Sequence, residues 1–88
     1  MFYVYILKSQ NVNKFYVGQT DNLDRRLEEH NLGYSSHTKK YVPWGIVYKE
    51  EYQTRKDAVE REKYFKSSAG RRWLKKNAQV AKLVDALP

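Results

Sequence analysis

The chain has 88 residues, with 17 Lys and Arg against ten Asp and Glu, and its formal net charge is +7 with a pI near 9.7. It contains no cysteine, which excludes a disulfide framework and any cysteine-ligated metal site. The length suits one domain, and the sequence shows neither an apolar run long enough to span a bilayer nor a signal-peptide leader. We therefore expect a cytoplasmic domain without membrane contact.

The basic residues are unevenly distributed along the chain. Nine of the 17 lie between Arg55 and Lys76. A basic surface attracts polyanions, and phosphate backbones are the commonest such partner. A basic domain with no such partner is the alternative, and charge alone says nothing about catalysis.

The first twenty residues are predicted to form a β-hairpin. Residues 2–7 (FYVYIL) are aromatic and β-branched, residues 9–13 are polar, and residues 15–19 (FYVGQ) resume the strand pattern. The two runs therefore read as paired strands joined by a turn.

A helix is predicted from Leu23 to about His30. Asp21 or Asn22 can cap its amino terminus, and Leu23 and Leu27 share its inner face. Residues 31–33 (NLG) end it.

The remainder of the domain alternates strand and helix patterns. Thr54 begins a helix with Asp57 three residues later, close to a capping box. We expect an irregular segment with one helical turn at residues 34–43 and a strand at residues 44–52. A helix at residues 54–67, an interruption at 68–70 and a short helix at 71–76 follow. The order β-β-α-β-α-α predicts an α+β fold with a three-stranded, mainly antiparallel sheet flanked by helices.

We limit the predicted domain to residues 1–76 and treat residues 77–88 as a tail of doubtful origin. Residues 78–88 (AQVAKLVDALP) could extend a helix. Codon choices also exist under which they spell the 5′ part of a bacterial leucine tRNA gene. The hypothesis is an open reading frame that runs into a neighbouring tRNA gene, which the genomic nucleotide sequence would test.

Glu62 stands out in the second predicted helix. Ala58, Glu62 and Phe65 are spaced four and three apart, so they share one stripe of the helix. An unpaired carboxylate between apolar neighbours is costly. Glu62 is therefore either paired to an Arg or Lys at the core edge or placed in a cleft as a metal ligand or acid/base group.

Arg26 and His30 lie four residues apart on the first helix, beside its apolar face. Phosphodiester cleavage needs a cation for the non-bridging oxygens and a group that moves a proton near neutral pH. This pair supplies both, although an ordinary surface pair is an open alternative.

The predicted hairpin carries tyrosines, and Gly18 follows Tyr16 by two residues. Tyr on a half-buried strand is usually structural. Glycine within a strand often marks the close approach of a ligand or another backbone.

Taken together, these residues resemble the signature of the GIY-YIG nuclease superfamily, and in particular its small stand-alone bacterial members. The likeness covers residues 1–76 and includes an arginine eight residues after the motif glycine and a histidine four further on. The matching positions are Tyr3-Val4-Tyr5, Tyr16-Val17-Gly18, Arg26, His30 and Glu62.

The sequence departs from the family pattern at two motif positions. Tyr3 replaces the glycine of the first motif, and Val17 replaces the isoleucine of the second. Asn77 is a candidate for a late polar residue of the family, and His37 lies where some members carry a further histidine.

The resemblance implies a single-metal hydrolysis in which Glu62 binds Mg²⁺ or Mn²⁺. It implies that Tyr5 helps to deprotonate the attacking water. Either His30 takes the proton of Tyr5, or the metal and Arg26 stabilise its phenolate, and the choice of Tyr5 or His30 as general base stays open. Arg26 would hold the phosphate, Tyr16 would orient the water or a phosphate oxygen, and Gly18 would let the nucleic acid pass closely. Candidate phosphate-backbone contacts are Lys39, Lys40, Arg71, Arg72, Lys75 and Lys76.

The sequence therefore predicts an endonuclease that cleaves nucleic acid, DNA rather than RNA, with low sequence specificity. Structure selectivity and a role in repair are part of this expectation, and a protein partner could supply the targeting. A non-catalytic nucleic-acid-binding module on the same scaffold is the first alternative. A protein-interaction adaptor is the second.

Overall fold

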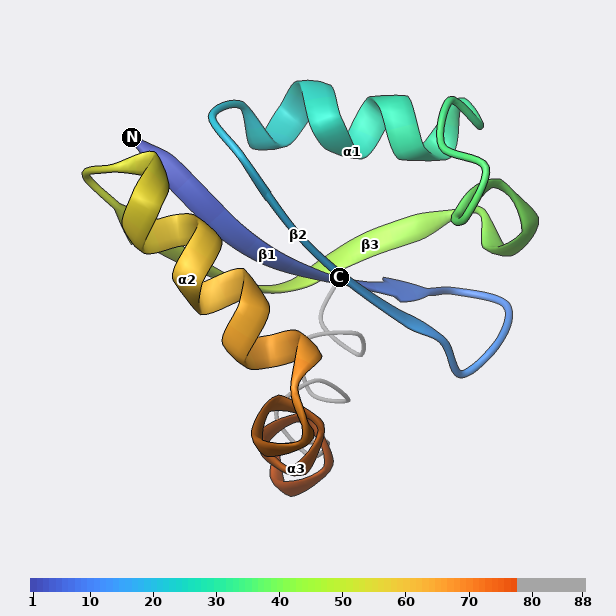
Figure 1. The fold of residues 1–88 in the computed structure, drawn as a ribbon. Helices are drawn as coiled ribbons and strands as arrows, with labels where there is room; N and C mark the ends of the chain where they lie inside the picture. The colour runs from blue at the N-terminus through green and yellow to red at the C-terminus, as the bar shows by residue number, and fades with distance from the viewer. Residues whose placement is uncertain (78–88) are drawn as a thin grey trace.

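The computed structural model describes residues 1–77, and these contain three strands, three α-helices and one turn of 3₁₀ helix (Figure 1). The elements occur in the predicted order β-β-α-β-α-α. They are β1 (Phe2–Ser9), β2 (Phe15–Thr20), α1 (Leu23–Asn31), η1 (Lys39–Tyr41), β3 (Trp44–Tyr52), α2 (Arg55–Lys66) and α3 (Ser68–Lys76).

The three strands form one antiparallel sheet with β1 in the centre, in the order β2-β1-β3. Tyr5 lies opposite Gly18 of β2 and opposite Lys49 of β3. The pairing of β1 with β3 is irregular between Ile6 and Leu7. The predicted α+β class with a three-stranded antiparallel sheet is thus confirmed.

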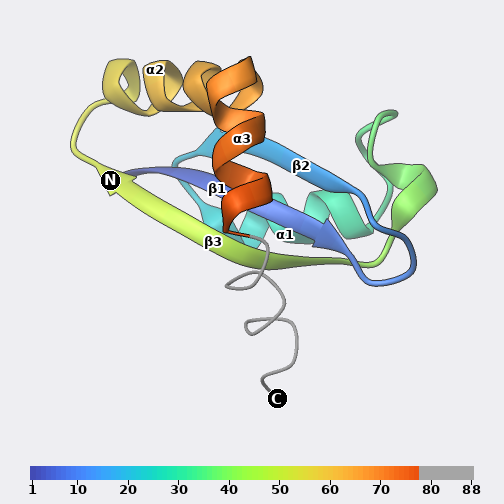
Figure 2. The ribbon, with the colours of Figure 1, turned by 90° about the horizontal axis from the view of Figure 1, so that it is seen from below.

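The alternation of side chains along β1 divides the core between the two faces of the sheet. Val4 and Ile6 pack with Ala58 and Phe65 of α2. Tyr5 and Leu7 pack on the other side with Trp44 and with the leucines of α1. Figures 1 and 2 show α1 on one side of the sheet and α3 on the other.

The start of each α-helix is capped by a side chain. Asn22 accepts a hydrogen bond from the backbone N–H of Arg25 at 3.0 Å, and Thr54 accepts one from that of Asp57 at 3.2 Å. Each cap satisfies one of the free N–H groups of a helix amino terminus. These two starts agree with the sequence prediction.

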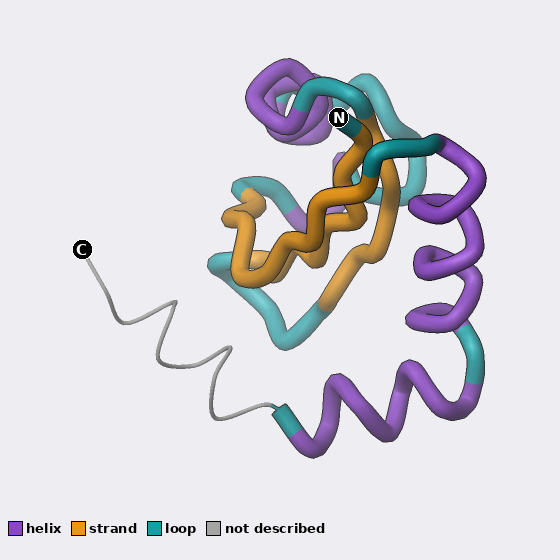
Figure 3. Tube along the Cα trace, turned by 90° about the vertical axis from the view of Figure 1, so that its left-hand side faces the viewer, coloured by secondary structure: helices purple, strands orange, loops and turns teal. Residues whose placement is uncertain are grey.

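The predicted interruption at residues 68–70 was wrong. Ser67 alone separates α2 from α3, and its hydroxyl accepts from the backbone N–H of Gly70. Gly70 lies in the first turn of α3. A side chain does not fit there, because the backbone of Tyr64 and Phe65 occupies the position that a Cβ would take. The glycine therefore allows a close crossing of two helices and does not break one. Figure 3 shows the sharp turn between them.

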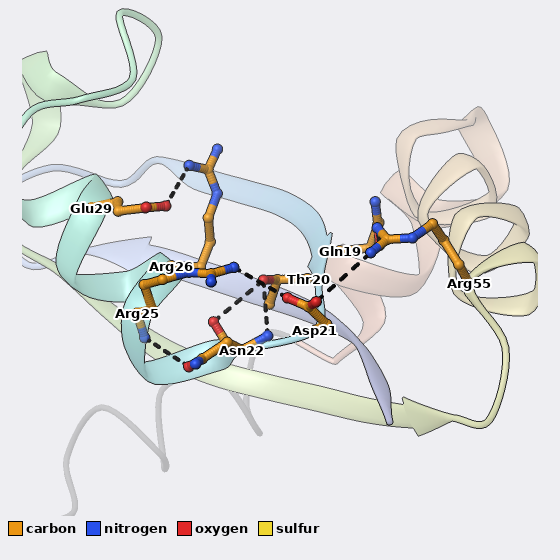
Figure 4. Close-up of polar contacts among 8 residues, drawn as sticks. All are labelled: Gln19, Thr20, Asp21, Asn22, Arg25, Arg26, Glu29 and Arg55. Carbon is orange, nitrogen blue, oxygen red and sulfur yellow. Dashed lines mark hydrogen bonds and ion pairs between the residues drawn. The ribbon is translucent and has the colours of Figure 1, made fainter.

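Glu50 of β3 fixes the position of α2 against the sheet. The Nε of Arg61 on α2 donates to its carboxylate at 2.9 Å, and the hydroxyls of Tyr48 and Tyr52 donate to it as well. At the start of α2, Arg55 donates to the side chain of Gln19 at 3.1 Å (Figure 4). Helix α2 is thus held both to β3 and to the end of β2.

None of the helices within residues 1–77 is long and apolar enough to cross a membrane. The hypothesis on the origin of the tail concerns residues 78–88, which lie outside the described part of the chain.

Candidate active site

Two tyrosines of the hairpin and one histidine of α1 meet on the α1 side of the sheet. The hydroxyl of Tyr5 lies 3.1 Å from Nε2 of His30. The ring centroid of Tyr16 is 4.7 Å from that of His30 and 6.3 Å from that of Tyr5. Tyr16 pairs with Leu7 across the sheet, which places it on the same face as Tyr5. The fold thereby brings Tyr5 and His30, which are 25 positions apart in sequence, into polar contact.

Gly18 makes room for this arrangement. A Cβ at this position would lie 2.5 Å from the hydroxyl of Tyr5 and 3.1 Å from the ring of Tyr16. The glycine is itself buried. Its lack of a side chain is therefore required by contacts within the protein, and the expected approach of nucleic acid at Gly18 stays a prediction.

His30 is completely buried, so its interpretation as half of an ordinary surface pair was wrong. Its Nδ1 lies 2.8 Å from the hydroxyl of Thr38. Burial, followed by the positive charge of Arg26, lowers the pKa of His30 to about 4. The imidazole is thus neutral at pH 7, and one of its nitrogens can accept a proton.

The protein environment shifts the pKa of Tyr5 in the opposite direction, upward. Burial raises the pKa of its hydroxyl to about 12, and Arg26 opposes part of that increase. The negative charge of Glu62 contributes to the raised pKa, which places this carboxylate within electrostatic reach of Tyr5. Tyr5 is therefore protonated at pH 7, with a neutral acceptor beside it.

Arg26 lies at the edge of the group. Its guanidinium forms an ion pair with Glu29 at 3.2 Å, as Figure 4 shows, and also acts on the hydroxyls of Tyr5 and Tyr16. About a third of its side chain is exposed, at 32%. Its neighbour Arg25 extends instead toward Asp21, 3.2 Å away on the surface. Of the two arginines, Arg26 is thus the one that a ligand at the tyrosines would meet.

Glu62 of α2 is semi-buried, as its position between Ala58 and Phe65 predicted. Its side chain is 21% exposed, and Nζ of Lys66 donates to it at 2.7 Å. Lys66 also lies 5.9 Å from the ring centroid of Tyr16. The carboxylate therefore has the lysine partner of one sequence interpretation, and its role as a metal ligand or acid/base group stays a prediction.

A hard divalent cation fits this carboxylate only with most of its ligands supplied by water. Within residues 1–77 no three His, Cys, Asp or Glu side chains form a group able to hold a metal ion. Mg²⁺ binds in this manner, through one or two carboxylates together with substrate oxygens and several waters. The partner Lys66 is 53% exposed and flexible, so it can give way to such an ion.

The predicted phosphate contacts fall in two separate places. Lys39 and Lys40 are exposed on η1, which follows α1. The other four are exposed on α3, which packs on the opposite face of the sheet (Figure 2): Arg71, Arg72, Lys75 and Lys76. Only the first group lies on the side of Tyr5 and His30.

Comparison with known proteins matches residues 1–77 to the family described as the GIY-YIG catalytic domain. The chain belongs to this family. It is 39% identical over 67 residues to a UPF0213 protein of Clostridium perfringens, a match that covers 75% of this chain and 71% of that protein. A UPF0213 protein of Pediococcus pentosaceus is 38% identical over 80 residues, with 86% and 83% covered.

A solved structure supports the same assignment. The solution NMR structure of a UPF0213 protein from Bacillus halodurans matches this fold with a TM-score of 0.50 and 28% identity, over 84% of this chain and 82% of that one. The expected resemblance to small bacterial GIY-YIG proteins is thus confirmed.

The two departures from the GIY-YIG motif lie on different faces of the sheet, because Tyr3 shares the face of Tyr5 by the alternation along β1. Val17 packs on the opposite face of the sheet with Val4 and Ile6. Tyr3 lies under the ammonium group of Lys49, 5.9 Å from its ring centroid. Asn77 donates to the carbonyl of Trp73 at 2.8 Å, so it closes the last turn of α3 and does not join the site.

Two residues at the candidate site of this GIY-YIG domain, Thr38 and Lys66, were not predicted from the sequence. Thr38 is 1% exposed, contacts His30, and accepts a hydrogen bond from the indole of Trp44 at its carbonyl. It lies in an irregular segment, where no periodicity indicates which side chain turns inward. Lys66, by contrast, could have been found, because it follows Glu62 by four residues on a helix.

Proposed function

We propose that this GIY-YIG domain is a metal-dependent endonuclease that hydrolyses phosphodiester bonds in DNA with little sequence specificity, possessing structure selectivity and a role in repair. The observation that carries the proposal is the buried, neutral His30 bonded to the hydroxyl of Tyr5. A proton acceptor, a phosphate-binding cation and a carboxylate lie around that contact, as hydrolysis of a phosphodiester requires. Membership of a family described as a catalytic domain supports the same conclusion.

The positions of the protons in the site follow from which groups can donate a hydrogen bond and which can accept one. Arg26 acts on the hydroxyl of Tyr5 and, as a guanidinium, can only donate, so the proton of Tyr5 is left to point to Nε2 of His30. Nε2 then carries the lone pair, and Nδ1 donates its proton to Thr38. This tautomer suits a base, because the nitrogen that faces the site is unprotonated.

The transfer of the tyrosine proton to His30 cannot come first. The raised pKa of Tyr5 and the lowered pKa of His30 both disfavour a tyrosinate beside an imidazolium before the phosphate is bound. Tyr5 must therefore pass its proton to His30 while it takes one from the attacking water. A phosphate bound to Arg26 assists, since it offsets the positive charge that lowers the pKa of His30.

Glu62 is the residue that would hold the divalent cation, and Tyr16 lies where it can orient the water or a phosphate oxygen. When bound, the cation supplies Lewis-acid polarisation of the phosphate and charge stabilisation of the leaving oxygen. Arg26 would neutralise the charge of the non-bridging oxygens of a bound phosphate.

Cleavage of labelled plain, nicked, flapped and branched DNAs tests the proposal with a matched pair of variants. Glu62→Ala should abolish cleavage that depends on Mg²⁺ or Mn²⁺. Glu60→Ala, an exposed carboxylate on the same helix, should retain it. Equal activity in wild type and Glu62→Ala would place the metal elsewhere or reveal a contaminating nuclease.

A non-catalytic binding module is the second candidate, and the ion pair between Glu62 and Lys66 favours it. In that case Glu62 has a structural partner and needs no metal. Tight, salt-sensitive DNA binding that ignores Mg²⁺ and survives Glu62→Ala, with no cleavage of any substrate, would establish this function instead.

A further inference from the structure

An open cleft of about 350 Å³ adjoins the candidate site. Tyr16 and Thr38, which both contact His30, also line this cleft. The other lining residues are Lys14, Phe15, His37, Tyr41, Trp44 and Lys66. A molecule bound here would contact Tyr16, the residue proposed to orient the attacking water or a phosphate oxygen.

The lining combines aromatic rings with positive charge and contains no carboxylate. The ammonium group of Lys14 lies 5.8 Å from the ring centroid of Tyr41, and that of Lys66 lies 5.9 Å from the ring centroid of Tyr16. Phe15 is 37% exposed. Rings that stack on bases, interleaved with lysines that track the backbone, are the features by which proteins bind single-stranded nucleic acid.

A second cleft provides a comparison within the same molecule. It has nearly the same volume, about 340 Å³, and includes Tyr52 and Tyr64. Its charged lining residues are Asp57, Glu60 and Arg61, so negative charges outnumber positive ones and disfavour a phosphate backbone. The two clefts are thus similar in size, and the one next to His30 differs from the other both in its larger number of aromatic rings and in its charge.

We propose that the cleft beside Tyr16 receives one unpaired nucleotide that neighbours the scissile phosphate. Its volume lies at the lower end of small-molecule sites, enough for about one nucleotide. A base within a continuous duplex is paired and stacked on its neighbours, so it cannot present a face to Tyr41 or Phe15. This inference rests on the proposed nuclease function and names its substrate class: DNA with a single-stranded segment at the cut, such as a flap or an overhang.

Binding measurements in EDTA test the cleft without depending on cleavage. The probes are a fluorescent single-stranded DNA and the same strand in a blunt duplex, followed by anisotropy. Tyr41→Ala should weaken binding of the single strand by about tenfold or more, the effect of losing one stacked base, and leave duplex binding within about twofold. Tyr41→Phe should restore the affinity, because it keeps the ring.

Two controls separate stacking from loss of structure. Tyr34→Ala removes a tyrosine that is 73% exposed and outside the cleft, and it should not change binding. Lys14 lies in the hairpin turn, away from the core. Lys14→Gln should weaken single-strand binding more than Lys56→Gln, which changes an exposed lysine on α2.

The outcomes distinguish this inference from the function on which it rests. Equal losses for single strand and duplex in Tyr41→Ala, or no loss for either, would overturn the cleft assignment. Metal-dependent cleavage of continuous duplex as fast as of flapped DNA would also overturn it, while leaving the nuclease function intact. Selective single-strand binding that needs Tyr41 would support it even if no cleavage were found.

Discussion

Thr38 occupies a position from which it can determine the protonation of His30. Its hydroxyl lies 2.8 Å from Nδ1, and its carbonyl is held by the indole of Trp44 at 2.9 Å. In the proposed tautomer, Nδ1 donates its proton to this hydroxyl and Nε2 is left to accept from Tyr5. Thr38 is thus a positioning residue, because it acts through His30.

We expect Thr38→Val to lower kcat by about tenfold, the effect of losing one hydrogen bond to the base, with little change in KM. Thr38→Ser, which keeps the hydroxyl, should restore the rate. The ¹⁵N shifts of the His30 ring report the tautomer directly. An unchanged ring spectrum in Thr38→Val would show that the hydroxyl does not determine the tautomer.

Gly18 offers a test of packing at the tyrosines. Gly18→Ala should reduce the free energy of unfolding by about 1–3 kcal/mol, because the new methyl group would meet the hydroxyl and ring of Tyr5. Gly45→Ala is the matched control, since its Cβ would meet only the side chain of Gln10 at 3.7 Å. Urea unfolding of both variants would contradict the steric account if the two losses were equal.

Helix α3 shows two opposing effects at one glycine. Helix propensity alone predicts that Gly70→Ala stabilises the protein by about 1 kcal/mol. The backbone of Tyr64 and Phe65 occupies the position of the new Cβ, however, and backbone cannot move aside as a side chain can. We therefore expect a net loss of about 1–3 kcal/mol in urea unfolding. Ser68→Ala, an exposed position on the same helix, should change the stability by less than about 0.5 kcal/mol.

The order of strands and helices could be predicted because each element carries its own local signal. Two aromatic and β-branched runs around a polar turn marked the hairpin. Asp21 or Asn22, and Thr54, marked the starts of α1 and α2. The inward direction of Glu62 followed from its spacing to Ala58 and Phe65.

The burial of His30 could not be predicted in the same way. The helix pattern placed it beside the leucines of α1, but whether it met solvent depended on the segment that covers it. That segment includes Thr38 and has no periodic pattern. Likewise, the role of Ser67 as the junction of α2 and α3 depended on a helix crossing, which local composition does not indicate.

For the protein as a whole, His30 links stability to pH. Its pKa is about 4 in the folded protein, against about 6.5 in an unfolded chain. Above pH 6.5 the ring is neutral in both states, so it contributes no pH dependence. Between pH 6.5 and 4 only the unfolded chain binds the proton, and the free energy of unfolding should fall by an amount on the order of 3 kcal/mol. Below pH 4 this loss is complete.

Urea unfolding at several pH values from 7.5 to 4 would measure this slope. His30→Gln should lose this fall in the free energy of unfolding between pH 6.5 and 4, whatever its absolute stability. His37→Gln should keep the fall, because His37 is exposed. A wild-type slope that matches that of His30→Gln throughout would show that His30 titrates normally in the folded protein.

The enclosure of His30 also affects the chemical reactivity of the folded protein. The chain has two histidines, of which His37 is exposed and His30 has no accessible surface. An acylating reagent selective for imidazole should therefore label His37 at once, and His30 only when α1 or the segment around Thr38 moves away from the ring. The labelling rate of this one buried ring would then measure how often the assembled site opens.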